Sequence, residues 1–168
     1  MQNNNVEFWL RGPVEGVPPL LQPVAHALLQ ANSEIQDIIN NFPKDKLWQK
    51  PASVASVGFH LQHIVGVLDR LFTYSKGNSL TEIQLDYLRK EGKEEDSLTP
   101  NGLAAALQQQ IHTSIDYLKT IDENTLTQVR TVGRKQLPST VMGLLFHSAE
   151  HTMRHTGQLM VTARVLTQ

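Results

Sequence analysis

Residues 143–159 read GLLFHSAEHTMRHTGQL and contain three histidines spaced four residues apart. Apolar residues recur through this stretch and on to Ala163 at the spacing of an amphipathic helix. Side chains four positions apart on a helix lie one above the other on the same face. The stretch therefore predicts one long helix, from a Ser139 cap after Pro138 to about Leu166, with a row of imidazole rings along one side.

Three further segments have helical periodicity and recognisable ends. The second of them is expected to start at a Ser53 cap and to stop before Gly77, because glycine readily ends a helix. The third starts at the pair Thr99-Pro100, a cap followed by a proline in the first helical position. The predicted ranges are 20–40, 53–75 and 99–121.

The connections between these helices are unequal in length. About 24 residues separate the helices at 53–75 and 99–121, and they include a short helical stretch around residues 81–89. Such a connection is long enough to cross the length of a bundle. Before the last helix, VRTVGRKQLPS predicts a turn or short hairpin around Gly133. We therefore predict an all-α fold, a four-helix bundle with a long crossover between helices 2 and 3, as a single domain over residues 1–168.

Composition excludes several classes of function. The chain has no cysteine, so disulfides, thiolate ligands and a cysteine nucleophile are impossible. The net charge is −1 with no basic block, which argues against a nucleic-acid partner. No apolar run is long enough to span a membrane, and the opening MQNNNVEFWLRGP does not resemble a secretory signal, so a cytoplasmic location is expected. Only 18% of residues are charged, and we expect a homodimer.

The histidines indicate a metal site. The second helix carries the pair His60 and His63, and the last helix carries the row described above. Two histidines four apart can bind one metal ion together, and a third from a facing helix completes three ligands. Three protein ligands leave a position open for water or substrate, which is typical of catalytic rather than structural sites. Nitrogen ligands suit several divalent metals and do not distinguish among them.

Helical periodicity favours one pair in the last helix. His155 lies about 70–80° from the centre of the apolar stripe, His151 about 110–120° and His147 about 150–160°. His151 and His155 therefore border the interior, and they are the preferred ligands. The same count in the second helix places His60 nearer the apolar stripe than His63.

A competing motif overlaps this row. His147-Ser-Ala-Glu150-His151 matches the H-x-x-E-H pattern of inverted zinc peptidases, in which the glutamate is the general base. Glu150 falls on the polar side of its helix, more than about 100° from the apolar stripe. It is therefore expected to point away from a site at the bundle centre.

The sequence resembles the DinB-like family, which includes the YfiT-type proteins described as metal-dependent hydrolases. The resemblance rests on SVGFHLQHIVGVLDRLF at 56–72 and GLLFHSAEHTMRHTGQL at 143–159. It implies a four-helix bundle with up-down-down-up topology. It also implies His63, His151 and His155 as the metal ligands of a divalent ion such as zinc or nickel. His60 and His147 lie outside this triad, and Gln158 matches a family Gly-Gln pair that lines the site.

The resemblance also suggests an activity. Members of the family include S-transferases that use a low-molecular-weight thiol, so we expect a metal-dependent enzyme acting on a small molecule. The alternatives are a metal-dependent hydrolase and a metal-binding protein without catalysis. No carboxylate base is evident beside the histidines, which favours the transferase over the hydrolase.

Overall fold

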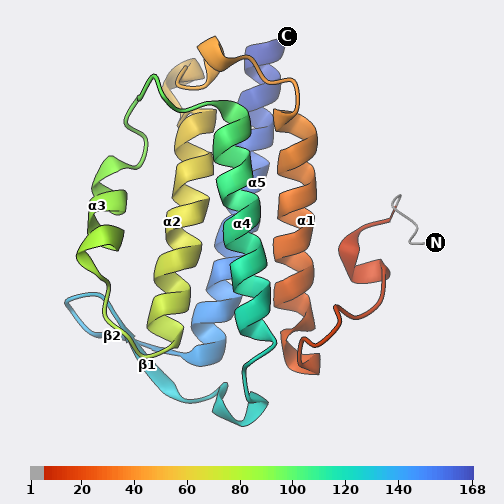
Figure 1. Ribbon diagram of the computed structural model, residues 1–168, viewed down its shortest axis with the longest axis vertical. Coiled ribbons are helices and arrows are strands. Elements are labelled where there is room, and N and C mark those ends of the chain that lie inside the picture. The colour runs from red at the N-terminus through yellow and green to blue at the C-terminus, as the bar shows by residue number, and fades with distance from the viewer. Residues whose placement is uncertain (1–5) are drawn as a thin grey trace.

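A computed structural model describes residues 6–168 of the protein, and it is mostly helical (Figure 1). The predicted helical class is thus confirmed. Residues 1–5, the first part of the opening MQNNNVEFWLRGP, lie outside the described residues. Across residues 6–168, no helix is long and apolar enough to cross a membrane. The α-helices of the described part are α1 (Gln22–Ile39), α2 (Val57–Ser75), α3 (Glu82–Lys90), α4 (Pro100–Leu118) and α5 (Val141–Thr167), and its strands are β1 (Val129–Val132) and β2 (Leu137–Thr140).

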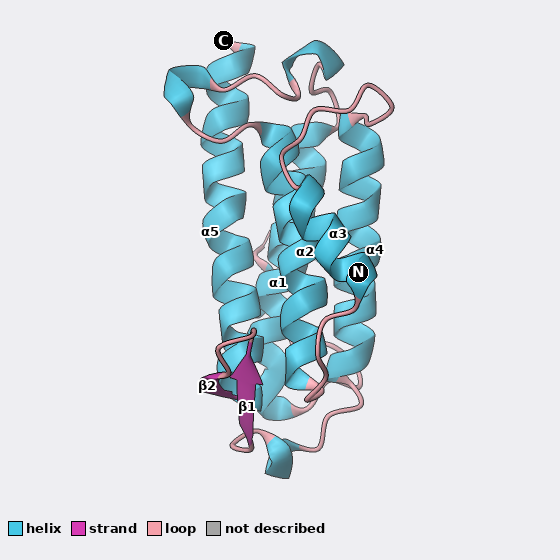
Figure 2. Ribbon diagram, turned by 90° about the vertical axis from the view of Figure 1, so that its left-hand side faces the viewer, coloured by secondary structure: helices cyan, strands magenta, loops and turns pink. Residues whose placement is uncertain are grey.

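The four long helices lie side by side. Helix α5 packs against α1 and α2, and α4 packs against the same two helices. Helices α1 and α5 run in one direction and α2 and α4 in the opposite one (Figure 1). Because α2 and α4 are parallel, the chain between them must return along the molecule, and it does so through α3, which lies outside the long helices and packs against α2 (Figures 1 and 2).

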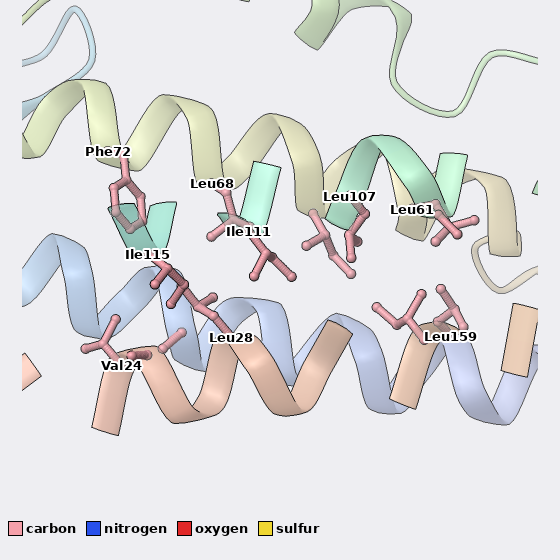
Figure 3. Close-up of a cluster of buried hydrophobic side chains, with 14 of the residues drawn as sticks. Val24, Leu28, Leu61, Leu68, Phe72, Leu107, Ile111, Ile115 and Leu159 are labelled. Atoms are coloured by element: carbon pink, nitrogen blue, oxygen red, sulfur yellow. The ribbon is translucent and has the colours of Figure 1, made fainter. Parts of the chain in front are cut away.

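Leucine and isoleucine side chains from all four long helices form the core (Figure 3). Leu28, Leu61, Leu107, Ile111 and Leu159 are fully buried there. Burying a side chain of this size stabilises the fold by about 1.5–3 kcal/mol. This packing fixes α2 and α5 relative to each other, and those two helices carry five of the seven histidines.

The two predicted serine caps were wrong, by three residues for α2 and by one residue for α5. Helix α2 is capped by Ser56, whose hydroxyl accepts a hydrogen bond from the Phe59 amide at 3.2 Å. Ser53 cannot cap it because its φ is +62°, outside the extended region that a cap requires. Helix α5 is capped by Thr140, whose hydroxyl accepts a hydrogen bond from the Gly143 amide at 3.0 Å. Ser139 lies one residue earlier, in β2.

The smaller predicted elements were confirmed. Helix α3 begins at a Thr81 capping box with Gln84, close to the expected start. Thr99 caps α4, with Pro100 in its first turn. The turn expected around Gly133 joins β1 to β2 in an antiparallel hairpin.

Candidate metal centre

Three histidines from two helices converge between α2 and α5. His63 comes from α2, and His151 and His155 from successive turns of α5. Each offers one ring nitrogen, and these nitrogens all lie within 4.8 Å of one another. The three ring centroids are 4.5–5.2 Å apart, and all three side chains are partly buried. The structure therefore brings together the three residues that the family resemblance implied. We refer to them as the histidine cluster.

The cluster has the donors that a divalent metal requires. The Nε2 atoms of His63 and His151 are 3.0 Å apart, and two nitrogens bound to one tetrahedral zinc ion lie about 3.4 Å apart. The buried Nδ1 of His151 has no hydrogen-bond partner in the described part of the chain. A buried nitrogen without a partner is unfavourable unless something binds it. The two Nε2 atoms therefore fit a metal ion, whereas Nδ1 is the second nitrogen of the His151 ring and cannot bind the same ion.

A carboxylate that the sequence analysis missed orients one of these rings. Glu91, directly after α3, accepts a hydrogen bond from His63 Nδ1 at 2.7 Å. Its other oxygen accepts one from Arg70 at 2.5 Å, and the Glu91 side chain is only 5% exposed. Because the proton of His63 is then on Nδ1, its Nε2 carries a lone pair and faces His151 Nε2 at 3.0 Å. Hydrogen bonds of this kind set the orientation and tautomer of metal-binding histidines.

The end of α3 is held in place by contacts with α2. The Gly92 amide donates a hydrogen bond to the side-chain Oε1 of Gln62 at 2.7 Å. The Tyr87 hydroxyl donates one to the backbone carbonyl of Gln62 at 3.1 Å. Burial raises the pKa of Tyr87 to about 12, so the hydroxyl keeps its proton. Gly66 leaves the space that the carboxylate occupies, since a Cβ at that position would lie 2.2 Å from Glu91 Oε1.

His60 and two members of the histidine cluster, His151 and His155, are neutral at neutral pH. His60 is 3% exposed, and its Nδ1 lies 2.9 Å from His155 Nδ1. Burial, followed by the charge of His63, lowers the pKa of His60 to about 4 and that of His155 to about 3. Burial also lowers the pKa of His151. Neutral imidazole is the form that binds a metal.

The competing H-x-x-E-H residues lie on the outer side of α5. His147 has a half-exposed side chain, and its Nδ1 is 3.5 Å from Glu150 Oε2. Together with His151 they form a second group that could hold an ion. However, Glu150 also forms an ion pair with Arg154, whose hydrogen bond lowers the pKa of the carboxyl. This group is more open to solvent than the histidine cluster, as the periodicity of the helix predicted.

The remaining site residues lie next to the cluster rather than in it. The Phe59 ring stacks on His63, with centroids 5.1 Å apart and planes 12° from parallel. Gln158, implied by the resemblance to line the site, lines a pocket that also touches His60. His60 therefore contacts one member of the cluster directly and connects the cluster to this pocket.

These observations define a class of protein: a helical protein with three histidines gathered between two of its long helices. The model of the DinB superfamily matches residues 27–159, and the chain belongs to this superfamily. Two solved structures are similar in fold. One is a conserved protein from Enterococcus faecalis, with a TM-score of 0.68 and 18% identity, covering 88% of this chain and 97% of that one. The other is a DinB-like protein from Bacillus subtilis, with a TM-score of 0.62 and 19% identity, covering 87% and 93%. The search of curated proteins found no match.

Proposed function

We propose that the protein is a metal-dependent enzyme that acts on a small molecule, of the thiol-dependent S-transferase type. In this proposal His63, His151 and His155 hold one divalent ion, with zinc or nickel the expected metals. The observation that carries the proposal is the convergence of three ring nitrogens within 4.8 Å of one another. Membership of the DinB superfamily supports it.

The surrounding residues serve such a site in separate ways. A divalent ion bound there would supply a Lewis acid that lowers the pKa of a thiol or water bound to it. Glu91 holds His63 in the tautomer that leaves Nε2 free. Phe59 covers one face of the His63 ring and limits its rotation. With three protein ligands, the remaining positions are available to a cosubstrate.

The carboxylates near the cluster favour a transferase over a hydrolase. A hydrolase of this kind commonly uses a free carboxylate as a general base. Both oxygens of Glu91 are already bound, one to His63 and the other to Arg70. Glu150 is paired with Arg154 on the outer side of α5. A thiol transfer needs no such base, because the nucleophile is a thiolate.

The proposal is tested with protein loaded with zinc or nickel. The protein is incubated with a low-molecular-weight thiol and an alkyl halide, so that the sulfur displaces halide and the thiol proton passes to buffer. Thiol loss and thioether formation are followed by mass spectrometry. We expect turnover in the wild type and in His112→Ala, a control at an exposed histidine of α4, and none in His151→Ala.

Two other outcomes would contradict the proposal. Thiol-independent hydrolysis of a p-nitrophenyl ester that His151→Ala abolishes, without thiol transfer, would indicate a hydrolase. Stoichiometric metal binding without turnover of either substrate would indicate a metal-binding protein without catalysis. Elemental analysis of protein purified without a histidine tag gives the metal content that all three interpretations require.

A further inference from the structure

A pocket of about 580 Å³ opens beside the histidine cluster. It lies between the C-terminal half of α5 and the segment that precedes α2. Pockets of about 300–1,000 Å³ are the usual size for organic ligands. Its wall is mostly apolar and includes Val54, Ala55, Met153, Gly157 and Val161.

The pocket offers no unpaired charge to an occupant. Arg154 is the one charged residue of its wall, and its guanidinium is bound to Glu150 through Nε at 2.9 Å and through a second nitrogen. The polar groups on the wall are neutral side chains, including His60 and Gln158. A wall of this kind suits an uncharged, largely apolar molecule, because a charged one would lose its hydration without gaining a partner.

One end of the pocket lies against His60, which contacts the histidine cluster. His60 lines the pocket, and its Nδ1 lies 2.9 Å from Nδ1 of His155. The His60 side chain therefore separates one end of a molecule in the pocket from the proposed metal site. A ligand site with an apolar wall and a few polar groups at one end is the usual design of an enzyme pocket.

Gly157 keeps part of this space open. It lies inside α5, where glycine is less favourable than any residue except proline. A Cβ at this position would meet no atom within 4 Å, so the packing of the helix does not require glycine here. The lack of a side chain leaves room in the pocket instead.

We infer that this pocket binds the apolar part of the substrate, a neutral organic molecule whose reactive end faces the histidine cluster. The orientation of the reactive end rests on the proposed function, whereas the apolar character of the occupant rests on the wall alone. The substrate class is therefore a neutral electrophile with an aliphatic or aromatic body.

The test uses the neutral fluorescent dye N-phenyl-1-naphthylamine, which brightens in apolar surroundings. The dye is titrated into the wild type, Gly157→Leu and Ala105→Leu. Ala105→Leu is the matched control, because it adds the same side chain at an exposed position of α4 that is no part of the pocket. We expect one dye per chain in the wild type and in the control, and at least tenfold weaker binding in Gly157→Leu.

Several measurements on the same samples make the outcome decisive. Gly157→Leu should melt at or above the wild-type temperature, because leucine is a better helix former than glycine. Equal dye affinity in all three proteins, or no dye binding in the wild type, overturns the inference. So does sedimentation showing a wild-type dimer that Gly157→Leu converts to a monomer, because the pocket would then hold a second copy of the chain. Zinc content and thiol transfer are measured separately, so failure of the proposed function is distinguishable from failure of the pocket.

Discussion

Replacing Glu91 by glutamine is expected to weaken metal binding at the histidine cluster. The carboxylate accepts two hydrogen bonds from two different donors, His63 Nδ1 at 2.7 Å and Arg70 at 2.5 Å. A glutamine side chain has one acceptor oxygen and one NH₂ group. Since a guanidinium can only donate, the oxygen must face Arg70 and the NH₂ must face His63.

This exchange reverses the tautomer of His63. Nδ1 would become an acceptor, and the ring proton would move to Nε2, the nitrogen that faces His151 across 3.0 Å. A metal could then bind this nitrogen only by displacing the proton or by breaking the new hydrogen bond. Loss of such an orienting partner typically lowers metal affinity about 10- to 100-fold, which corresponds to about 1.4–2.8 kcal/mol.

The assay is competition between the protein and a coloured chelator for zinc at pH 7.5. Glu94→Gln is the matched control, because it makes the same chemical change three residues further along the same connection at an exposed position. We expect wild-type affinity in the control and a 10- to 100-fold loss in Glu91→Gln, with both proteins folded by circular dichroism. If the affinity of folded Glu91→Gln stays within twofold of the wild type, Glu91 does not orient a metal ligand and the reasoning fails.

Three further predictions concern the metal ligands, the stability in acid and the assembly of the chain. His63→Ala, His151→Ala and His155→Ala should each lose most bound zinc in elemental analysis, whereas His147→Ala should keep it; the reverse pattern would favour the H-x-x-E-H interpretation. Since the folded pKa values of His60 and His155 are about 4 and about 3, below the ordinary 6.5, the unfolded chain takes up protons first as the pH falls. The metal-free protein should therefore lose stability between about pH 6.5 and pH 4 in urea titrations, and a flat profile over this range would be inconsistent with neutral buried rings. A homodimer remains a prediction, and sedimentation at micromolar concentration should give twice the chain mass of 18.8 kDa rather than the monomer.

Much of the fold was predictable because its signals are local. Apolar spacing, the Thr99-Pro100 start of α4 and the glycine after α2 each act within one or two turns of helix. The caps that were misplaced depend on backbone conformation. Ser53 lies in a separate turn, Pro51–Ser53, with left-handed backbone. Ser139 and Thr140 both lie in β2, and the Thr140 hydroxyl is the one that accepts the hydrogen bond from the Gly143 amide. Neither condition can be read from spacing alone.

Glu91 could not be found from spacing either. It lies 28 residues from His63, on a connection whose path depends on how α3 packs against α2. Two glycines give the only local signal within the described residues. Gly66 leaves room for the carboxylate, and Gly92 has a φ of +76° and places its amide on Gln62. These requirements become visible only when the two segments are side by side.

The two histidines of α2 show why periodicity selects a core residue and misses the residue proposed as a metal ligand. The apolar stripe favoured His60, and His60 is indeed the buried one, at 3% exposed. Burial, however, is a poor criterion for a ligand of an open site, because such a ligand must face both the interior and the space that substrate enters. His63 meets this condition: it is partly buried, one nitrogen is fixed by a buried carboxylate, and the other faces α5. His60 instead contacts His155 and lines the apolar pocket. A residue at the border of the apolar stripe that has a distant charged partner, such as His63, is therefore the better candidate ligand. A histidine within the stripe, such as His60, is instead a buried neighbour of the site.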